Sequence, residues 1–225
     1  MTGVDLESNL ERVREGITNA CRRSDRDPPS VTLVAVTKTV PVELVARARD
    51  LGVTDFGENY VQELAEKREA APEARWHYVG TLQSHSAHRV ADQADVVHSL
   101  EPGKAARRLA ARAARRGKDL PALVQVDFTG RRAGTDPNEI ESFVAEATGL
   151  RGLRVTGLMT LPPEPAAPED ARPYFRRLRE LLEGLRRDFP GMTELSMGMS
   201  LDYEVAVEEG ATIVRVGTAL FGMRG

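Results

Sequence analysis

A lysine follows an apolar stretch of the sequence, where its amine could serve as a nucleophile. The run LVAVTKTVP, residues 33–41, is typical of a buried strand up to Val36, and Lys38 comes just after it. The chain has 31 lysines and arginines, but only four are lysines: Lys38, Lys67, Lys104 and Lys118. Arginine cannot form a Schiff base, whereas lysine can. We therefore expect amine chemistry at Lys38, although a solvated lysine at a strand end stays open.

Two later turns carry residue types that bind anions. ELSMGMSLDYEVA, residues 194–206, and VRVGTALFG, residues 214–222, both place small or hydroxylated residues between a strand and a helical pattern. Backbone N–H groups at such turns can converge on a phosphate. The candidate contacts are Ser196, Gly198, Ser200, Gly217 and Thr218. Either turn alone is also a common strand-to-helix connection.

Arg215 is a charge between two valines in an otherwise buried strand. It is either half of a structural ion pair or a cation aimed at a bound ligand. Lys38, the two turns and Arg215 together describe a pocket for a phosphorylated aldehyde. Pyridoxal 5′-phosphate (PLP) fits all three requirements.

The other reactive side chains form weaker patterns. Cys21 is the only cysteine, and its apolar helix position predicts a small core residue. His77, His85 and His88 lack carboxylates at a recognisable spacing, so we expect no metal site. The three lysines other than Lys38 fall in or beside polar helix faces, where we expect solvated cations. No Ser/His/Asp grouping, GxGxxG or P-loop pattern occurs.

Composition excludes several partner classes. The formal net charge is −3 with interspersed signs, which gives no field for nucleic acid or an anionic membrane. No apolar stretch is long enough to span a bilayer, and the first residues, MTGVDLESNLERV, show no signal peptide. We therefore expect a cytoplasmic protein.

Apolar periodicity predicts alternating strands and helices. The first helix, at 4–21, has an apolar face of Leu6, Leu10, Val13, Ile17 and Cys21. Further helices are expected at 41–51, at 104–116 with a face of Ala105, Leu109 and Ala113, and at 172–187 with a face of Tyr174, Leu178, Leu181 and Leu185. Strands are expected at 31–37, 53–57, 75–80, 95–98, 121–127, 153–159, 193–196 and 212–216.

This alternation favours an α/β fold, a single-domain (β/α)8 TIM-type barrel with an extra N-terminal helix, spanning 1–225 with its core at about 30–222. An open doubly wound sheet is the competitor. The segment 127–134 is expected to be a turn after the fifth strand. The Pro-rich segment 162–173 is expected to be a semi-rigid loop over one rim, either a lid or a plain connection.

Several motifs closely resemble the pyridoxal phosphate homeostasis protein family, the YggS-like group, in unbroken order from about 30 to 222. They are LVAVTKTVP, FGENYVQE (56–63), WHYVGTLQS (76–84), GLMTL (157–161), SMGMSLDYEVAVEEGAT (196–212) and VRVGTALFG. The resemblance implies a barrel similar to the N-terminal domain of alanine racemase. It also implies that PLP is bound as an internal aldimine, without an established catalytic activity.

The resemblance assigns roles by position. Lys38 becomes the Schiff-base residue, and Arg215 approaches the pyridine nitrogen. Asn59 lies near the ring substituents, and His77 is a wall of the pocket. The phosphate contacts are Ser200, Gly217 and Thr218.

Two departures from the family pattern are visible. The chain has LQSHS where the family usually has LQxNK, so His85 and Ser86 replace Asn-Lys and leave the role of that segment in doubt. Arg132 replaces a lysine before Gly134, which removes a possible secondary site for aldimine formation.

We expect a PLP carrier and buffer in PLP homeostasis, which is no enzyme, is monomeric by default and has PLP-dependent apoenzymes as possible acceptors. An amino-acid racemase is the alternative. That chemistry needs a second acid/base, which comes from a further C-terminal domain in the racemases, and we expect none because the sequence ends at Gly225. A Schiff-base aldolase on the same fold is a third possibility.

Overall fold

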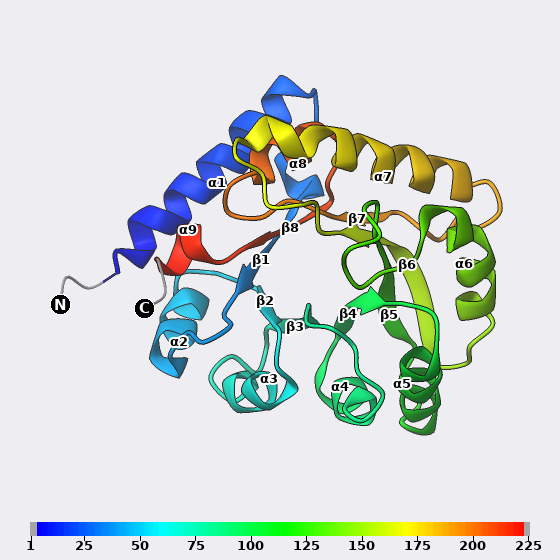
Figure 1. Cartoon of the computed structure of the whole chain (residues 1–225). Helices are drawn as coiled ribbons and strands as arrows, with labels where there is room; N and C mark the ends of the chain where they lie inside the picture. Colours follow the sequence, from blue (N-terminus) through cyan, green and yellow to red (C-terminus); the bar gives the residue numbers. More distant parts are fainter. Residues whose placement is uncertain (1–3, 223–225) are drawn as a thin grey trace.

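The chain folds into a closed parallel barrel (Figure 1). The computed structural model describes residues 4–222, and eight strands within them pair in chain order from β1 to β8, with β8 returning to β1. The barrel expected from the sequence is confirmed, and the open sheet is wrong. The strands are β1 Thr32–Val36, β2 Asp55–Glu58, β3 Arg75–Tyr78, β4 Val96–Leu100, β5 Leu120–Val126, β6 Leu153–Thr160, β7 Glu194–Ser196 and β8 Ile213–Val216.

Helices surround the barrel on its outer side (Figure 1). The α-helices of the described residues are α1 Leu6–Arg23, α2 Val42–Asp50, α3 Val61–Arg68, α4 Ala87–Gln93, α5 Lys104–Arg115, α6 Ile140–Thr148, α7 Arg172–Leu185, α8 Tyr203–Glu208 and α9 Thr218–Phe221. Short 3-10 turns lie at Pro28–Ser30, Pro137–Glu139 and Pro168–Ala171. Within residues 4–222, no helix has both the length and the apolar character that a bilayer crossing needs.

The extra helix α1 covers the outside of the barrel beside α8 and α9. All five residues of its predicted apolar face are buried, Cys21 included. Helix α1 lies beside α9 (Figure 1). Asn9 Nδ2 donates to the Leu220 carbonyl at 2.9 Å, which ties the two helices together. The two ends of the described residues therefore pack together on the outside of the barrel.

The buried stripe of α7 differs from the predicted one. Phe175, Leu178, Leu182 and Leu185 are buried, whereas Tyr174 and Leu181 are only partly buried. At 100° per residue the four buried side chains span an arc of about 80°, and the two others fall just outside it. On α5 the same shift by one residue brings Ala106 and Ala110 into the core and leaves Ala105 at its edge.

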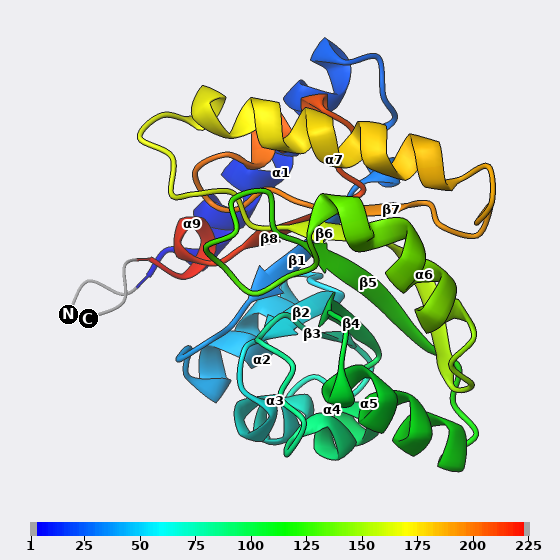
Figure 2. The same cartoon turned by 45° about the vertical axis from the view of Figure 1, so that its right-hand side comes forward.

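The carboxyl ends of the strands form one rim of the barrel. Below this rim, the barrel interior holds an apolar cluster of Val34, Val96, Leu123, Met159 and Ile213. The loops after β5 and β6 project on the same side as α9 (Figure 2). The loop after β6 is shorter than the predicted 162–173, because its second half forms the turn Pro168–Ala171 and α7 begins at Arg172.

Candidate functional site

One cavity of about 480 Å³ opens at this rim, between the ends of β1, β2, β7 and β8. It brings together six of the nine site residues predicted from the sequence: Lys38, Asn59, Ser200, Arg215, Gly217 and Thr218. The loop after β6 contributes Leu161, Pro162, Glu164 and Pro165. An amine, hydroxyls and a guanidinium therefore share one cavity although they come from opposite ends of the sequence.

A tight turn after β1 presents Lys38, which is half-buried. The Val40 N–H donates to the Thr37 carbonyl at 2.8 Å. Thr39 adopts a φ of 60°, a left-handed backbone that a β-branched residue rarely takes. Such a conformation persists only where the surroundings hold it, and here a cluster of charges does so.

The Lys67 cluster, made of Lys67, Glu58 and Glu63, clamps the backbone on both sides of Lys38. Lys67 Nζ donates to Glu58 Oε1 at 2.7 Å, to Glu63 Oε2 at 2.6 Å and to the Thr37 carbonyl at 2.6 Å. Glu63 Oε2 also accepts from the Thr39 N–H at 2.9 Å. The cluster thus holds the residue before Lys38 and the residue after it.

The expectation that Lys67 is solvated is wrong, because its exposed fraction is 3%. A buried ammonium is costly unless acceptors replace its water, and here two carboxylates and a carbonyl do so. Burial raises the pKa of Glu58, although hydrogen bonds from Lys67 and Thr37 lower it. The spacing of Glu63 and Lys67, four residues apart on one helix, is the signal that could have identified the pair.

The turn after β7 faces the turn after β8. Ser200 Oγ accepts from the Gly217 N–H at 3.2 Å and from the Ala219 N–H at 3.1 Å, so the two turns are joined at this hydroxyl. Gly198 has a φ of +90°, and a Cβ there would lie 2.5 Å from that of Ala206. Glycine is therefore required for this turn to lie so close to α8.

Asp202 is a pocket residue that sequence reasoning missed. It lines the cavity and is 1% exposed. Its Oδ1 accepts from the Met199 N–H at 2.6 Å, but its Oδ2 has no hydrogen-bond partner among the described residues. Burial raises the pKa of Asp202, although the Met199 N–H and the charge of Arg215 lower it. No sequence pattern distinguishes Asp202, because acidic residues are common where a helix begins.

Asn59 follows β2 and is half-buried at the cavity wall. Its N–H donates to Glu58 Oε2 at 3.2 Å, which links it to the Lys67 cluster. Gly80, after β3, lies against it: a Cβ at Gly80 would be 2.0 Å from the Asn59 carbonyl oxygen. The absence of a side chain at Gly80 therefore lets Asn59 sit in the wall.

Arg215 reaches the cavity from inside the barrel and is 5% exposed. Its Nη1 donates to Ser196 Oγ at 2.6 Å and its Nη2 to the Thr160 carbonyl at 3.1 Å. Burial lowers the pKa of Arg215 to about 10, so the group stays a cation at neutral pH. Arginine has five N–H donors, which leaves donors for a ligand in the cavity.

The three other predicted site residues, His77, Ser196 and Gly198, do not line the cavity. His77 and Ser196 are fully buried in the barrel interior, below Arg215. The prediction that His77 is a pocket wall is corrected: its Nε2 lies 2.9 Å from Asp55 Oδ1 and its Nδ1 2.8 Å from His98 Nε2. Ser196 acts on Arg215 rather than on the cavity itself. His98 was not predicted at all.

The two exposed histidines lie elsewhere. His85 and His88 are exposed beside and on α4, away from the buried His77. Residues 4–222 contain no group of three or more His, Cys, Asp or Glu side chains placed to hold a metal ion.

The chain is similar to known proteins over nearly its whole length. The family model of the alanine racemase N-terminal domain matches residues 8–225. A pyridoxal phosphate homeostasis protein of Aquifex aeolicus is 40% identical over 220 residues, which cover 96% of this chain and 96% of that protein. The chain belongs to the pyridoxal phosphate homeostasis protein family. The resemblance seen in the motifs is confirmed.

Solved structures agree with this family membership. PipY of Synechococcus elongatus PCC7942, solved with PLP bound, has a TM-score of 0.86 at 33% identity, covering 97% of this chain and 100% of that one. An alanine racemase of Clostridium difficile 630 has a TM-score of 0.74 at 16% identity, and the match covers 60% of its length. The racemase likeness shows the shared fold alone.

The two departures from the family pattern lie at different places. Arg132 lines the cavity, and its N–H donates to Asp127 Oδ2 at 2.8 Å within the turn 127–134, which forms as expected. Ser86 precedes α4, and its Oγ donates to the Gln83 carbonyl at 3.2 Å. Neither His85 nor Ser86 lines the cavity, so the LQSHS change lies outside the candidate site.

Proposed function

We propose that this chain binds PLP through Lys38 and serves PLP homeostasis as a carrier and buffer of the cofactor. The observation that carries this proposal is the single cavity shared by Lys38, the two joined turns of Ser200 and Gly217, and Arg215. These groups suit the aldehyde, the phosphate and the ring of PLP respectively. The names of the curated relatives and the PLP in the PipY structure support the same function.

Each group has a separate task in this proposal. When bound, PLP supplies an aldehyde that reacts reversibly with a primary amine and a ring that can act as an electron sink. The amine of Lys38 would hold the aldehyde carbon, with the carbonyl oxygen leaving as water, and would so mask its reactivity. Ser200, Gly217 and Thr218 hold the phosphate through hydroxyl and N–H groups. Asn59 lies beside the ring substituents.

Arg215 is the reason to propose a carrier rather than a catalyst. A guanidinium only donates hydrogen bonds, and its positive charge disfavours a proton on a neighbouring pyridine nitrogen. An unprotonated ring is a weaker electron sink for amino-acid chemistry. The chain would thus hold the cofactor tightly without using it.

Transfer of bound PLP to an acceptor tests delivery. The loaded protein is mixed with the apoenzyme of a PLP-dependent enzyme, and recovery of that enzyme's activity is timed against an equal concentration of free PLP. We expect faster or more complete recovery from the loaded protein when a PLP-trapping amine is present, because the bound aldehyde is masked. Transfer that is no better than from free PLP would contradict delivery while leaving storage.

An assay of alanine racemisation separates the carrier from the racemase. We expect the loaded protein to racemise alanine no faster than free PLP does, because a carrier needs no second acid/base opposite Lys38. Sustained interconversion of the enantiomers would establish the enzyme instead. Turnover of a sugar phosphate without any PLP absorbance would indicate the aldolase.

We also propose that the protein is a cytoplasmic monomer. Burial raises the pKa of the Cys21 thiol and keeps it a packing residue, which suits a reducing compartment. Among the described residues, the exposed large apolar side chains are Tyr60 at 54% and Leu201 at 53%, too few for a permanent apolar interface. Sedimentation analysis at two protein concentrations tests the monomer.

A further inference from the structure

A chain of hydrogen bonds crosses the barrel interior from β2 to β8. Asp55 Oδ1 lies 2.9 Å from His77 Nε2, and His77 Nδ1 lies 2.8 Å from His98 Nε2. His98 Nδ1 lies 2.8 Å from Ser196 Oγ, which accepts from Arg215 Nη1 at 2.6 Å. The link between His98 and Ser196 spans from β4 to β7. All five side chains belong to different strands.

The Asp55 carboxylate sets the direction of the bonds that run through the two rings. Arg215 can only donate, so Ser196 Oγ accepts from it, and towards His98 Nδ1 the hydroxyl can either accept a second hydrogen bond or donate its own proton. Asp55 as a carboxylate can only accept, so His77 Nε2 carries a proton and donates to it. A neutral imidazole has one N–H, so His77 Nδ1 must accept from His98 Nε2. All donors then point from Arg215 towards Asp55.

Burial and charge support neutral rings between two charged ends. Burial lowers the pKa of His77, and Asp55 only partly offsets this effect. Burial also lowers the pKa of His98 well below its usual value, helped by the charge of Arg215. Burial by itself would raise the pKa of Asp55, but hydrogen bonds from His77 and Thr54 lower it overall.

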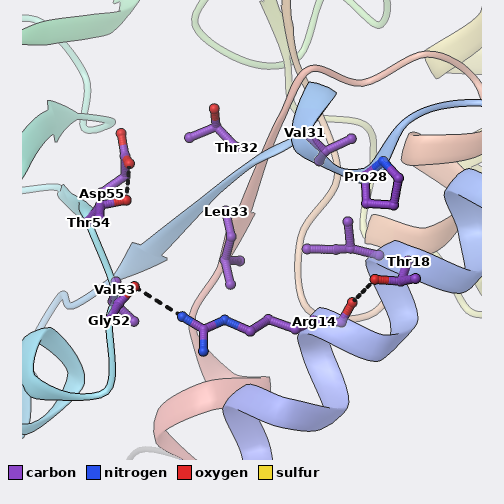
Figure 3. A pocket seen from close by; sticks show the side chains of 11 residues that line it. Arg14, Thr18, Pro28, Val31, Thr32, Leu33, Gly52, Val53, Thr54 and Asp55 are labelled. Carbon is purple, nitrogen blue, oxygen red and sulfur yellow. Dashed lines mark hydrogen bonds between the residues drawn. The ribbon is translucent and has the colours of Figure 1, made fainter.

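The Asp55 end of this series of hydrogen bonds reaches a second cavity. Asp55 begins β2 and lines a pocket of about 350 Å³ between α1 and the first residues of β1 and β2, where Thr54 Oγ1 donates to Asp55 Oδ2 (Figure 3). The side chain of Asp55 is 14% exposed, whereas that of His77 is fully buried. The hydrogen bonds therefore run from this end of the barrel to the cavity at the opposite rim.

We propose that Asp55, His77, His98 and Ser196 are positioning residues that act as a one-way hydrogen-bond relay and hold the guanidinium of Arg215 in the cavity. A fully satisfied network in a low-dielectric interior is rigid, which suits a side chain that must offer its remaining donors in a fixed direction. The relay itself is inferred from hydrogen bonds of the protein without any cofactor. Its effect on the ligand rests on the proposed function.

Nitrogen NMR of the histidine rings in the cofactor-free protein tests the direction. We expect His77 and His98 both to be Nε2–H tautomers at neutral pH, with unprotonated Nδ1 atoms. The chain has four histidines, and the exposed His85 and His88 supply reference signals. A protonated Nδ1 on either buried ring would overturn the relay.

Substitutions at Asp55 test whether this residue sets the tautomers of His77 and His98. Asp55→Asn keeps an acceptor for His77, so both tautomers should stay as in the wild type. Asp55→Leu removes it, so His77 should turn its proton to Nδ1 and force His98 to do the same. Thr32→Val, in the same pocket, is the matched control and should change neither ring. An unchanged His98 in Asp55→Leu would overturn the coupling, and if that variant does not fold, the wild-type and Asp55→Asn spectra still decide the direction.

Ligand affinity tests the positioning of Arg215. A lost buried hydrogen bond is worth up to about 1.4 kcal/mol, so Asp55→Leu should bind PLP about three- to tenfold more weakly, while Thr32→Val binds as the wild type. Equal affinity in Asp55→Leu would overturn the positioning role. If wild-type protein binds no PLP, the proposed function fails, but the ring tautomers still decide the relay.

Discussion

The position of Lys38, the clearest functional candidate in the sequence, depends on Lys67, for which no functional role was predicted. Lys38 stands out because this chain uses lysine so sparingly, and Lys67 was expected to be an ordinary surface cation. The structure buries Lys67 under the Lys38 turn and gives it three acceptors, two carboxylates and the Thr37 carbonyl. Two of the four lysines therefore serve the same turn, one for presentation and one for support.

Replacing Lys67 should affect both stability and binding. Lys67→Met leaves the buried Glu58 carboxylate without its ammonium, and removing one partner of a buried pair costs about 3–5 kcal/mol in the free energy of unfolding. PLP binding should weaken as well, because the Lys38 turn loses the bond to the Thr37 carbonyl. Urea denaturation and a PLP titration measure the two effects.

Two further variants make this prediction specific. Lys104→Met, at the exposed start of α5, should leave both quantities unchanged. Adding Glu58→Gln to Lys67→Met should recover part of the lost stability, since it removes the unpaired charge. A Lys67→Met protein as stable as the wild type would show that the cluster does not support the turn.

At this scale the sequence could identify residues but not their contacts. Five of the six cavity residues, Lys38, Ser200, Arg215, Gly217 and Thr218, were predicted because each follows or ends a strand whose carboxyl end faces the rim. Asn59 was predicted from the family resemblance alone. His98 was missed because its partner Ser196 lies across the barrel, and Asp202 was missed because an acidic residue at the start of a helix is ordinary. The His98–Ser196 bond joins residues 98 positions apart, and no local pattern encodes such a distance.

At the scale of elements, arginines of α7 bind the end of α8. Arg172, Arg176 and Arg179 each place a guanidinium nitrogen 3.1 Å from an oxygen of Glu209, just after α8. Burial alone would raise the pKa of Glu209, but the bonds from Arg176 and Arg172 lower it overall. The Ser200 turn comes before α8 and Glu209 comes after it, so this anchor holds the end of α8 that lies away from the candidate phosphate site.

Replacing Glu209 should make stability less dependent on pH. A carboxyl whose pKa is lowered by folding stabilises the fold fully above its usual value of 4.5 and loses this effect as the pH falls through its folded value. Glu209→Gln should therefore lower the free energy of unfolding by about 1–3 kcal/mol at pH 7, and the difference should shrink below pH ~4.5. Urea denaturation across this pH range measures it.

Glu180→Gln on the exposed side of α7 is the matched control for Glu209→Gln. It should be as stable as the wild type at every pH. A gap between Glu209→Gln and the wild type that stays constant down to strongly acidic pH would contradict the assigned role of Glu209.

The elements themselves could be predicted well, and for one physical reason. All eight strands were expected within a few residues of their observed bounds, because a strand buried on both faces reads as a short apolar run between turn signals. Helix faces were less certain. On α7 a phase error of one residue was enough to exchange Tyr174 and Leu181 for Phe175 and Leu182.

At the scale of the whole molecule, the barrel separates stability from function. The apolar cluster and the helices close its interior, and the candidate site lies at the carboxyl rim, where loops from several strands meet. The polar relay is the exception, since it runs through the interior to the other end. The same barrel is found in alanine racemases, so the fold alone does not decide between carrier and enzyme.

The most direct test of PLP binding at Lys38 is peptide mapping after borohydride reduction of the PLP-treated protein, combined with its absorption spectrum. We predict a yellow absorption band in the wild type, a covalent adduct on Lys38 alone, loss of both in Lys38→Ala, and retention of both in Lys104→Ala. A wild type without the band, or an adduct that persists on another lysine with unchanged yield in Lys38→Ala, would contradict the assignment of Lys38 as the binding amine.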